Sequence, residues 1–539
     1  MTRTFSPLTP EARTRLAQGF AHLRAGDAAA ALAIADALLA DLPGHPEALY
    51  LRSEACAAQG DSTGAIRALE GAVEASPGQW VLLLKLSRLL LGQRRRVAFR
   101  ELAAQAASAA GNDPEALFSV ARAYLAADQP ADALPLLERA VATPMGAGHP
   151  GLWQELATTQ FFLGDAAAAE RSIAKVLAIT PMAPGALHLR STLRRQSPGS
   201  NHVGDLRARL GRSQDPESRI ALLFALAKEH EDLGEDEAAF AALSDGARLR
   251  AARVGGEVSA EVAVMERIAQ RHTADALAAM GDGDPGTGPI FVIGMPRSGT
   301  TLLERMLGRV PGVAAAGELL DLKLVVGEAA QAVHATMPQG DLVDAVLRAQ
   351  AGALGAEYLR GAREAVPGSP WWLDKTPVNF LYAGLIRQCL PSAPILHLTR
   401  DPMDACFAVF KTLFGQAYPF SYRLDALADY YIAYRRLMAH WHRQFPGRIL
   451  DIPYEALVTD TETQARRVLG FCGFAWTDDV LQPERSTAPS TTASAAQVRE
   501  PIHRRSVGAW RRHAAGLEPL RARLEAAGLV DDRGDPVPH

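Results

Sequence analysis

The stretch PIFVIGMPRSGTTLLERML, residues Pro289–Leu307, decides the fold of the C-terminal half of the chain. Its apolar start, Ile290–Ile293, predicts a buried strand that runs into the loop Gly294–Gly299. A helix is expected to open directly after the loop, at Thr300 and Thr301. A loop between a strand and a helix start directs backbone N–H groups and the positive end of the helix to one point. The stretch therefore predicts an anion-binding site at the end of a strand.

Two further apolar stretches predict strands of the same sheet, Ile395–Thr399 and Ile449–Ile452. Helical segments separate them, and strands that alternate with helices are typical of a parallel sheet covered on both faces. The linker-like stretch GDGDPGTGP, residues Gly281–Pro289, precedes this region. We therefore expect residues 286–539 to form a P-loop-like, three-layer α/β domain with a mostly parallel sheet.

The loop has the glycine spacing of the Walker A sequence GxxxxGK[ST] but not its lysine. Thr300 occupies the lysine position, and Arg297 supplies a cation from inside the loop instead. In nucleotide triphosphatases that lysine reaches the β- and γ-phosphates, so its absence disfavours ATP or GTP hydrolysis. A phosphotransferase that uses the same loop is the alternative, and the missing lysine counts against it.

The first 200 residues are rich in alanine and leucine and repeat at a period of about 34 residues. The dipeptide Gly26-Asp27 recurs as Gly60-Asp61 and Gly164-Asp165, each followed by small or apolar residues at helical spacing. Small residues on one face let two helices approach closely. The pattern resembles the tetratricopeptide repeat and predicts an α-solenoid over residues 1–200, in which Gly92–Asn112 is a degenerate helix pair. An alanine-rich bundle without repeat geometry is the alternative.

Residues 201–285 are predicted to be a helical connector between the solenoid and the α/β domain. It contains FALAKEHEDLGEDEAAF, residues Phe224–Phe240, in which two helices flank a Leu-Gly turn. A continuation of the tetratricopeptide array with a different signature is the alternative for this connector.

Composition excludes several classes of protein. The formal net charge of −4 gives no basic surface for a nucleic-acid partner. Four cysteines lie far apart, which favours neither a disulfide framework nor a zinc site and fits the cytoplasm. No run of 18 or more apolar residues occurs, so no membrane span is expected. The sequence leaves open whether the chain forms a homodimer.

The sequence PRSGTT resembles the 5′-phosphosulfate loop of sulfotransferases that use 3′-phosphoadenosine 5′-phosphosulfate (PAPS). Five more blocks resemble this family in the expected order over most of residues 289–513. The resemblance implies PAPS as the sulfuryl donor and no metal. The blocks are LDKTPVNF (Leu373–Phe380), LHLTRDPMDACFAVF (Leu396–Phe410), IPYEALV (Ile452–Val458), RVLGFCGFAW (Arg467–Trp476) and QVREPIHRRSVGAW (Gln497–Trp510).

The resemblance assigns cofactor-binding roles to two of these regions. Arg400 would bind the 3′-phosphate through a charge-assisted hydrogen bond. The family usually has a serine eight residues later, where this chain has Ala408; Lys411, one helical turn further, could substitute. The alternative for Arg400 is a surface ion pair with Asp401 or Asp404. The residues that would bind the 5′-phosphate and sulfuryl group are Arg297, Ser298, Gly299, Thr300 and Thr301.

A basic C-terminal block is expected, by the same resemblance, to close over the cofactor. The block contains His503, at a place where relatives tend to carry an aromatic residue. For either arginine of the block, a solvent-exposed basic face is the alternative. The cofactor-binding residues predicted here are Arg504, Arg505, Ser506, Gly508 and Trp510.

Three residues are predicted to be catalytic: Glu318, Lys375 and Arg297. Counted from Arg297, Glu318 falls where tyrosylprotein sulfotransferases place a catalytic glutamate, so the resemblance makes it the general base. Lys375 resembles the lysine that stabilises the sulfuryl group and the leaving phosphate in those enzymes. Asp374 is the alternative base, and His397, inside an apolar strand, is expected to be a hydrogen-bonded core histidine.

These features predict transfer of a sulfuryl group from PAPS to an acceptor hydroxyl, with release of adenosine 3′,5′-bisphosphate. A solenoid offers an extended concave surface for a polypeptide. The acceptor is therefore predicted to be a tyrosine of a protein or peptide bound by the repeat array. The alternatives are a glycan or lipid hydroxyl as acceptor, or a scaffold whose sulfotransferase-like domain is inactive.

Overall fold

The computed structural model describes residues 8–337, 341–486, 488–491 and 499–537. The chain forms two compact units that divide between Thr159 and Gln160. The sequence modules predicted above change at residues 200 and 285 instead, and these boundaries stay predictions. The difference arises because the helices that follow residue 160 belong to the same compact unit as the α/β domain. No helix among the described residues is long and apolar enough to cross a membrane.

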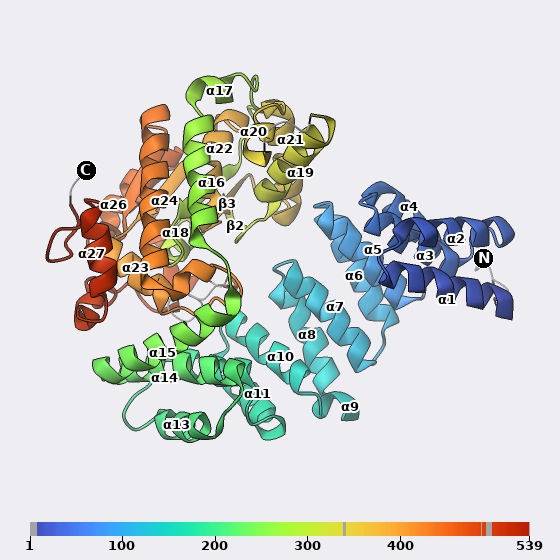
Figure 1. Cartoon of the computed structure of the whole chain (residues 1–539), viewed down its shortest axis with the longest axis horizontal. Helices are drawn as coiled ribbons and strands as arrows, with labels where there is room; N and C mark the ends of the chain where they lie inside the picture. Colours follow the sequence, from blue (N-terminus) through green and yellow to red (C-terminus); the bar gives the residue numbers. More distant parts are fainter. Residues whose placement is uncertain (1–7, 338–340, 487, 492–498, 538–539) are drawn as a thin grey trace. The chain divides into compact units, whose positions relative to one another are not determined.

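The first unit consists of helices that follow one another in pairs (Figure 1). Each pair begins about 34 residues after the previous one, as in tetratricopeptide arrays. The helices are α1 (Pro10–Arg24), α2 (Ala28–Asp41), α3 (Pro46–Ala58), α4 (Ser62–Ala75), α5 (Trp80–Gly92), α6 (Arg96–Ala109), α7 (Pro114–Ala126), α8 (Pro130–Val141), α9 (Pro144–Ala147) and α10 (Pro150–Leu163), the last of which extends into the second unit.

The recurring Gly-Asp dipeptide forms the turn inside a helix pair. The side chains of Asp27, Asp61 and Asp165 each accept a hydrogen bond from the backbone three residues later and so cap the second helix. The preceding glycine has a positive φ in each case, 82°, 81° and 96° respectively. The repeat predicted from the sequence is therefore confirmed at its turns.

The pair α5–α6 corrects one detail of the prediction. The segment Gly92–Asn112 is not a degenerate pair in itself, because it holds the turn and second helix of a regular pair that starts at Trp80. Arg94 takes the place of the turn glycine, with a φ of 61°, and Asp128 does so in the next pair, with a φ of 59°. Without the glycine, the sequence offered no turn signal at these positions.

Small, buried residues lie on the helix faces that pack against neighbouring helices. Ala65, Leu69 and Ala72 on α4 are fully buried, as are Ala31 and Ala35 on α2. Alanine at these positions lets neighbouring helices approach closely. The first unit is accordingly an α-solenoid, as the sequence predicted.

The connector helices share the hydrophobic core of the α/β domain. Phe224, Leu243 and Met265 lie in one buried cluster with Phe291 and other residues of the sheet. Figure 1 shows α16 in green beside α24 in orange. The connector helices are α13 (Val203–Arg212), α14 (Pro216–Leu233), α15 (Asp236–Val254), α16 (Val258–Arg271) and α17 (Ala274–Ala278); α11 (Ala166–Ile179) and α12 (Pro184–Thr192) precede the connector, within the predicted solenoid.

Five parallel strands form the sheet, in the order β2-β3-β1-β4-β5. Three of them, β1, β4 and β5, confirm the predicted strands. The strands are β1 (Pro289–Gly294), β2 (Val313–Ala315), β3 (Trp371–Asp374), β4 (Ile395–Thr399) and β5 (Ile449–Pro453).

Alternate residues of β1 face opposite sides of the sheet. Phe291 and Ile293 belong to the cluster that contains the connector helices, whereas Ile290 and Val292 belong to a second cluster with helices α18 and α26. Helices therefore cover both faces, and the predicted three-layer architecture is confirmed. The remaining helices are α18 (Thr300–Leu307), α19 (Asp321–Thr336), α20 (Leu342–Val346), α21 (Ala351–Ala365), α22 (Ala383–Cys389), α23 (Pro402–Phe410), α24 (Leu424–Gln444), α25 (Tyr454–Thr459), α26 (Thr461–Cys472) and α27 (Glu518–Ala526); 3₁₀ turns include η1 (Pro377–Tyr382), η2 (Pro419–Tyr422), η3 (Asp478–Leu481), η4 (Pro483–Arg485) and η6 (Ala509–His513).

The strand order places β1 at the centre of the sheet. The chain fills the β3 side first and then crosses to the β4 side, so the direction of winding changes at β1. In open α/β sheets, ligands bind beyond the carboxyl ends of the strands at such a switch point. The anion loop predicted from the sequence lies directly after β1 and therefore at this position.

Candidate functional site

The loop after β1 has the backbone of an anion-binding turn. Arg297 adopts a φ of 66° and Gly299 a φ of 108°, both in the left-handed region. A positive φ is uncommon for a residue with a side chain and often marks a functional site. Ser298 is buried, and its hydroxyl has no hydrogen-bond partner among the described residues. The α18 helix starts at Thr300, so its N-terminus follows the turn at once.

Gly299 is required by a close approach as well as by its φ. A Cβ atom added there would lie 2.6 Å from Cδ2 of Tyr454, the first residue after β5. Real Cβ atoms do not approach a neighbour so closely. The ring of Tyr454 therefore lies directly against the loop and fixes its distance from the end of β5.

Arg400 connects the loop to the C-terminal segment. Its Nη1 donates a hydrogen bond to the carbonyl oxygen of Arg297 (2.9 Å), and its Nη2 donates to the carbonyl oxygen of Ser506 (2.7 Å). The guanidinium lies over the ring of Tyr454, 4.8 Å from its centroid. Arg400 thus uses its donors on backbone carbonyls, and the alternative of a surface ion pair with Asp401 or Asp404 is not what holds it.

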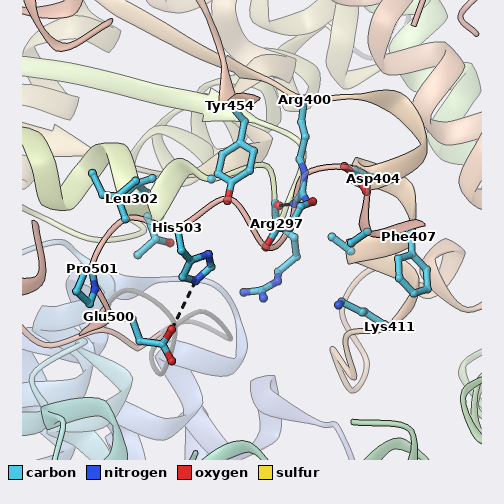
Figure 2. A pocket seen from close by; sticks show the side chains of 16 residues that line it. Arg297, Leu302, Arg400, Asp404, Phe407, Lys411, Tyr454, Glu500, Pro501 and His503 are labelled. Atoms are coloured by element: carbon cyan, nitrogen blue, oxygen red, sulfur yellow. Dashed lines mark hydrogen bonds and ion pairs between the residues drawn. The ribbon is translucent and has the colours of Figure 1, made fainter. Parts of the chain in front are cut away.

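These residues line one pocket beyond the carboxyl ends of β1, β4 and β5 (Figure 2). Its empty volume, including the part open to solvent, is about 820 Å³. Of the residues predicted to bind the cofactor, it brings together Arg297, Gly299, Thr301, Arg400 and Ser506. The other lining residues are Leu302, Asp404, Phe407, Ala408, Lys411, Tyr454, Glu500, Pro501, Ile502, His503 and Ala509.

The charge of the pocket favours an anionic ligand. Burial, together with the neighbouring guanidinium of Arg400, lowers the pKa of Arg297 to about 10. Arg297 is still a cation at neutral pH, so two like charges face the same space. An anion placed between them would relieve their repulsion and form charge-assisted hydrogen bonds with both. Figure 2 shows the side chains of Arg297 and Lys411 directed toward the same region of the pocket.

Lys411 reaches the pocket from the end of α23, one turn beyond Ala408. Its Nζ lies 2.7 Å from Oε1 of Glu231, which comes from the connector helix α14. Burial alone would raise the pKa of Glu231, but the charges of Lys411 and Arg512 lower it overall. The sequence analysis named Lys411 as a substitute for the missing serine, and in the structure Lys411 lines the same pocket as Arg400. The ion pair between Lys411 and Glu231 of the connector could not be predicted from the sequence.

The C-terminal segment enters the site through its backbone. The N–H groups of Gly508 and Trp510 donate to the carboxylate of Asp404, at 2.5 and 3.1 Å. Asp404 is itself buried at the start of α23. Gly508 and Trp510, which the sequence predicted to bind the cofactor, do not line the pocket: their N–H groups hold the segment beside it, and the Trp510 ring lies in the core.

Two predicted residues of this segment lie away from the pocket. Arg504 donates to the carbonyl oxygens of Val458 and Thr459, and Arg505 pairs with Glu500. Neither arginine is among the residues that line the pocket, although Glu500, the partner of Arg505, is one of them. Gln497 and Val498, which open the same sequence block, lie outside the described residues.

The predicted catalytic pair, Glu318 and Lys375, forms an ion pair. Nζ of Lys375 lies 2.7 Å from Oε1 of Glu318. Lys375 is only 1% exposed, which excludes the surface lysine considered from the sequence, whereas Glu318 is 44% exposed. They follow β3 and β2, on the other side of β1 from Arg400 and Tyr454. Neither lines the pocket described above, so the pair forms a second polar group along the same sheet edge.

Asp374, the alternative base, is fully buried at the end of β3. It accepts hydrogen bonds from the hydroxyls of Tyr358 (2.9 Å) and Thr376 (2.8 Å). Burial raises its pKa to about 7, and the hydrogen bonds of these hydroxyls offset only part of that rise. A pKa near 7 suits a general base, but a base must first reach the proton it removes. With no exposed surface and its oxygens occupied, Asp374 supports the end of β3, and Glu318 is the better placed carboxylate.

Several pocket residues were not singled out from the sequence. Tyr454 belongs to the block Ile452–Val458. Its position as an aromatic residue directly after a predicted strand was the feature that could have identified it. Asp404 was considered only as an ion-pair partner. The segment Glu500–His503 lines the pocket, and His503 lies 3.6 Å from Glu500. These four residues belong to the block Gln497–Trp510, in which the sequence drew attention to His503 but gave no role to Glu500, Pro501 or Ile502.

Comparison with known proteins supports a family for this region. Residues 289–478 match the family model described as the sulfotransferase family. The chain is 35% identical over 247 residues to an uncharacterized protein of Aquifex aeolicus; the match covers 44% of this chain and 32%, about a third, of that protein. It is 24% identical over 267 residues to protein-tyrosine sulfotransferase 2 of Gallus gallus, covering 44% of this chain and 68% of that protein.

A solved structure with similarity to this chain is the sulfotransferase domain of an olefin synthase from Synechococcus PCC 7002. The two are 20% identical, with a TM-score of 0.33, over 43% of this chain and 90% of that domain.

The raised pKa of Asp374 predicts a pH dependence of stability. The unfolded chain loses this proton near the ordinary value of 3.8, whereas the folded protein holds it up to about pH 7. Protonation therefore favours the folded state, and stability is lost as the pH rises between these values, by at most about 1.4 kcal/mol per pH unit. Asp374→Asn should remove this slope when the unfolding midpoint is followed from pH 4 to 7.

Asp479→Asn serves as the control for this measurement, because the Asp479 side chain is 57% exposed in the same unit. It should keep the wild-type slope. If Asp374→Asn also keeps it, Asp374 does not carry the buried proton.

Proposed function

We propose that this sulfotransferase-family domain, residues 286–539, transfers the sulfuryl group of PAPS to an acceptor hydroxyl and releases adenosine 3′,5′-bisphosphate. The observation that carries the proposal is the pocket at the carboxyl edge of the sheet. It combines a lysine-free phosphate loop after β1 with a second cationic group, Arg400 and Lys411, after β4. Two separate cationic positions fit a nucleotide that carries phosphate at both its 5′ and 3′ positions.

The residues present fit the two ends of such a nucleotide. The backbone N–H groups of residues 297–301, with the guanidinium of Arg297, would hold the 5′-phosphosulfate at the start of α18. Arg400 and Lys411 would hold the 3′-phosphate. The unpartnered hydroxyl of Ser298 supplies one more group that could bind an oxygen. No metal takes part in this scheme.

The pair Glu318–Lys375 would serve the acceptor. The acceptor oxygen attacks sulfur, the bond from sulfur to the bridging oxygen breaks, and the acceptor proton passes to the carboxylate of Glu318. Its partial exposure lets an acceptor hydroxyl approach it. Negative charge grows on the leaving phosphate, where Arg297 and Lys375 would bind more strongly in the transition state than in the ground state.

We take the acceptor to be a tyrosine of a protein or peptide. One of the relatives is named a protein-tyrosine sulfotransferase, and the α-solenoid of the first unit offers a surface suited to a polypeptide. We place the reaction in the cytoplasm, since the four cysteines are free and buried. The alternatives are a glycan or lipid hydroxyl as acceptor, or a scaffold whose sulfotransferase-like domain is inactive. In either case the peptide panel in the tests below would show no turnover.

Nucleotide selectivity tests the pocket. Isothermal titration of the full chain should show tight binding of adenosine 3′,5′-bisphosphate and little binding of AMP or ATP. Lys411→Ala should weaken bisphosphate binding about tenfold or more, because it removes one charge-assisted hydrogen bond, and should leave AMP unaffected. Lys175→Ala, an exposed lysine on α11, is the control. Equal affinity for ATP and the bisphosphate would favour the phosphotransferase alternative.

Turnover tests the catalytic pair. Glu318→Gln and Lys375→Ala should each lower sulfate transfer from labelled PAPS to a panel of tyrosine peptides by roughly 100-fold or more. Bisphosphate affinity should change little, because Glu318 would contact the acceptor and Lys375 would act on charge that develops only in the transition state. Glu462→Gln, an exposed carboxylate on α26, should behave as wild type. Full activity of Glu318→Gln would place the base elsewhere, and loss of bisphosphate binding in both variants would make the pair a structural support.

A further inference from the structure

A second polar cluster lies outside the proposed reaction site, where β4, β5 and α24 meet. It consists of His397 on β4, Asp451 on β5 and His442 near the end of α24. His397 and Asp451 are register partners on neighbouring strands. The proposed transfer uses none of the three.

The ligand atoms of these side chains converge. Nδ1 of His397 lies 2.7 Å from Oδ1 of Asp451, and Nε2 of His442 lies 3.0 Å from the same oxygen. All three atoms lie within 4.8 Å of one another. In a tetrahedral zinc site, ligands about 2.1 Å from the ion are about 3.4 Å apart. The two contacts with the Asp451 oxygen therefore need only a small widening for the cluster to hold an ion in place of the protons that these hydrogen bonds now share.

The surroundings of His397 resemble those of a metal ligand. Its second nitrogen, Nε2, contacts the hydroxyl of Tyr434. Metal-binding histidines almost always make such a hydrogen bond with the ring nitrogen that does not bind the ion. A hydroxyl can donate or accept, so Tyr434 can satisfy Nε2 both when Nδ1 carries a proton and when Nδ1 binds a cation.

The cluster is closed on one side and open on the other. The His397 side chain is 2% exposed, whereas His442 is 33% and Asp451 is 46% exposed. A cation can reach the cluster from solvent and keep a water molecule as its fourth ligand. Arg435 is the nearby cation that acts on both imidazoles. Its charge lowers the affinity for a second cation without occupying the three ligand atoms.

We propose that His397, His442 and Asp451 bind one divalent first-row transition cation, represented by Zn²⁺. Two imidazole nitrogens and one carboxylate oxygen suit Zn²⁺ and its neighbours and do not suit Mg²⁺, which prefers oxygen ligands alone. The bound ion joins β4, β5 and α24. It thereby braces the strand that ends at Thr399, immediately before Arg400.

Titration of the full chain tests the site after treatment with a chelator. Isothermal titration with Zn²⁺ should detect one site that His442→Ala and Asp451→Asn weaken at least about 100-fold. Tyr434→Phe should weaken it about 10- to 100-fold, as loss of a supporting hydrogen bond does. Co²⁺ should give a visible absorption band that the same variants lose, and Mg²⁺ should not compete.

His149→Ala is the matched control, because His149 also lies near a carboxylate, Glu115 at 3.6 Å, in the first unit. It should keep the site. Zn²⁺ binding of wild-type strength in both His442→Ala and Asp451→Asn, or no binding in the wild type, would overturn the proposal. The readout is metal binding alone, so it is independent of whether the chain transfers sulfate.

Discussion

The contact between Tyr454 and Gly299 is the constraint on which the rest of the site depends. The ring occupies the space of a Cβ atom at Gly299, so the loop after β1 is held against the end of β5. The other side of the site is fixed through the same ring, because the guanidinium of Arg400 lies over it. Arg400 then donates to the backbone of the loop and of the C-terminal segment. One aromatic side chain thus sets the spacing of three chain segments around the pocket.

The parallel sheet explains why the polar residues gather at one edge. All five strands end at the same edge, and each is followed within a few residues by a side chain of the site described above. These side chains are Glu318 after β2, Lys375 after β3, Arg297 after β1, Arg400 after β4 and Tyr454 after β5. The connector helices close this arrangement from one face. They also supply Glu231, the ion-pair partner of Lys411, whose ammonium lines the pocket. The connector is therefore part of the α/β unit in both packing and charge.

The sequence predicts those parts of the fold that have strong local signals. The strands β1, β4 and β5 are runs of largely apolar residues, and the loop between β1 and α18 carries the glycines that its turn requires. Strands β2 and β3 were missed because Val-Ala-Ala is short and Trp-Trp-Leu-Asp has no alternating pattern. The turn at Arg94 was missed because a residue other than glycine adopts the positive φ.

The sequence could predict only those site residues that directly follow a recognisable strand. The loop after β1 and Arg400 after β4 are such residues. The pairing of Lys375 with Glu318, and the contact of Tyr454 with Gly299, join residues that are 57 and more than 100 positions apart, and no local pattern encodes them. Burial also separates Glu318 from Asp374, the two carboxylates that the sequence left open as bases, because Glu318 is partly exposed and Asp374 is not.

The structure of the chain with adenosine 3′,5′-bisphosphate bound tests the account most directly. The account predicts the 5′-phosphate at the N–H groups of residues 297–301, the 3′-phosphate between Arg400 and Lys411, and Tyr454 still in contact with the loop. A nucleotide bound away from the carboxyl edge of the sheet, or with its 3′-phosphate in solvent and free of Arg400, would contradict it.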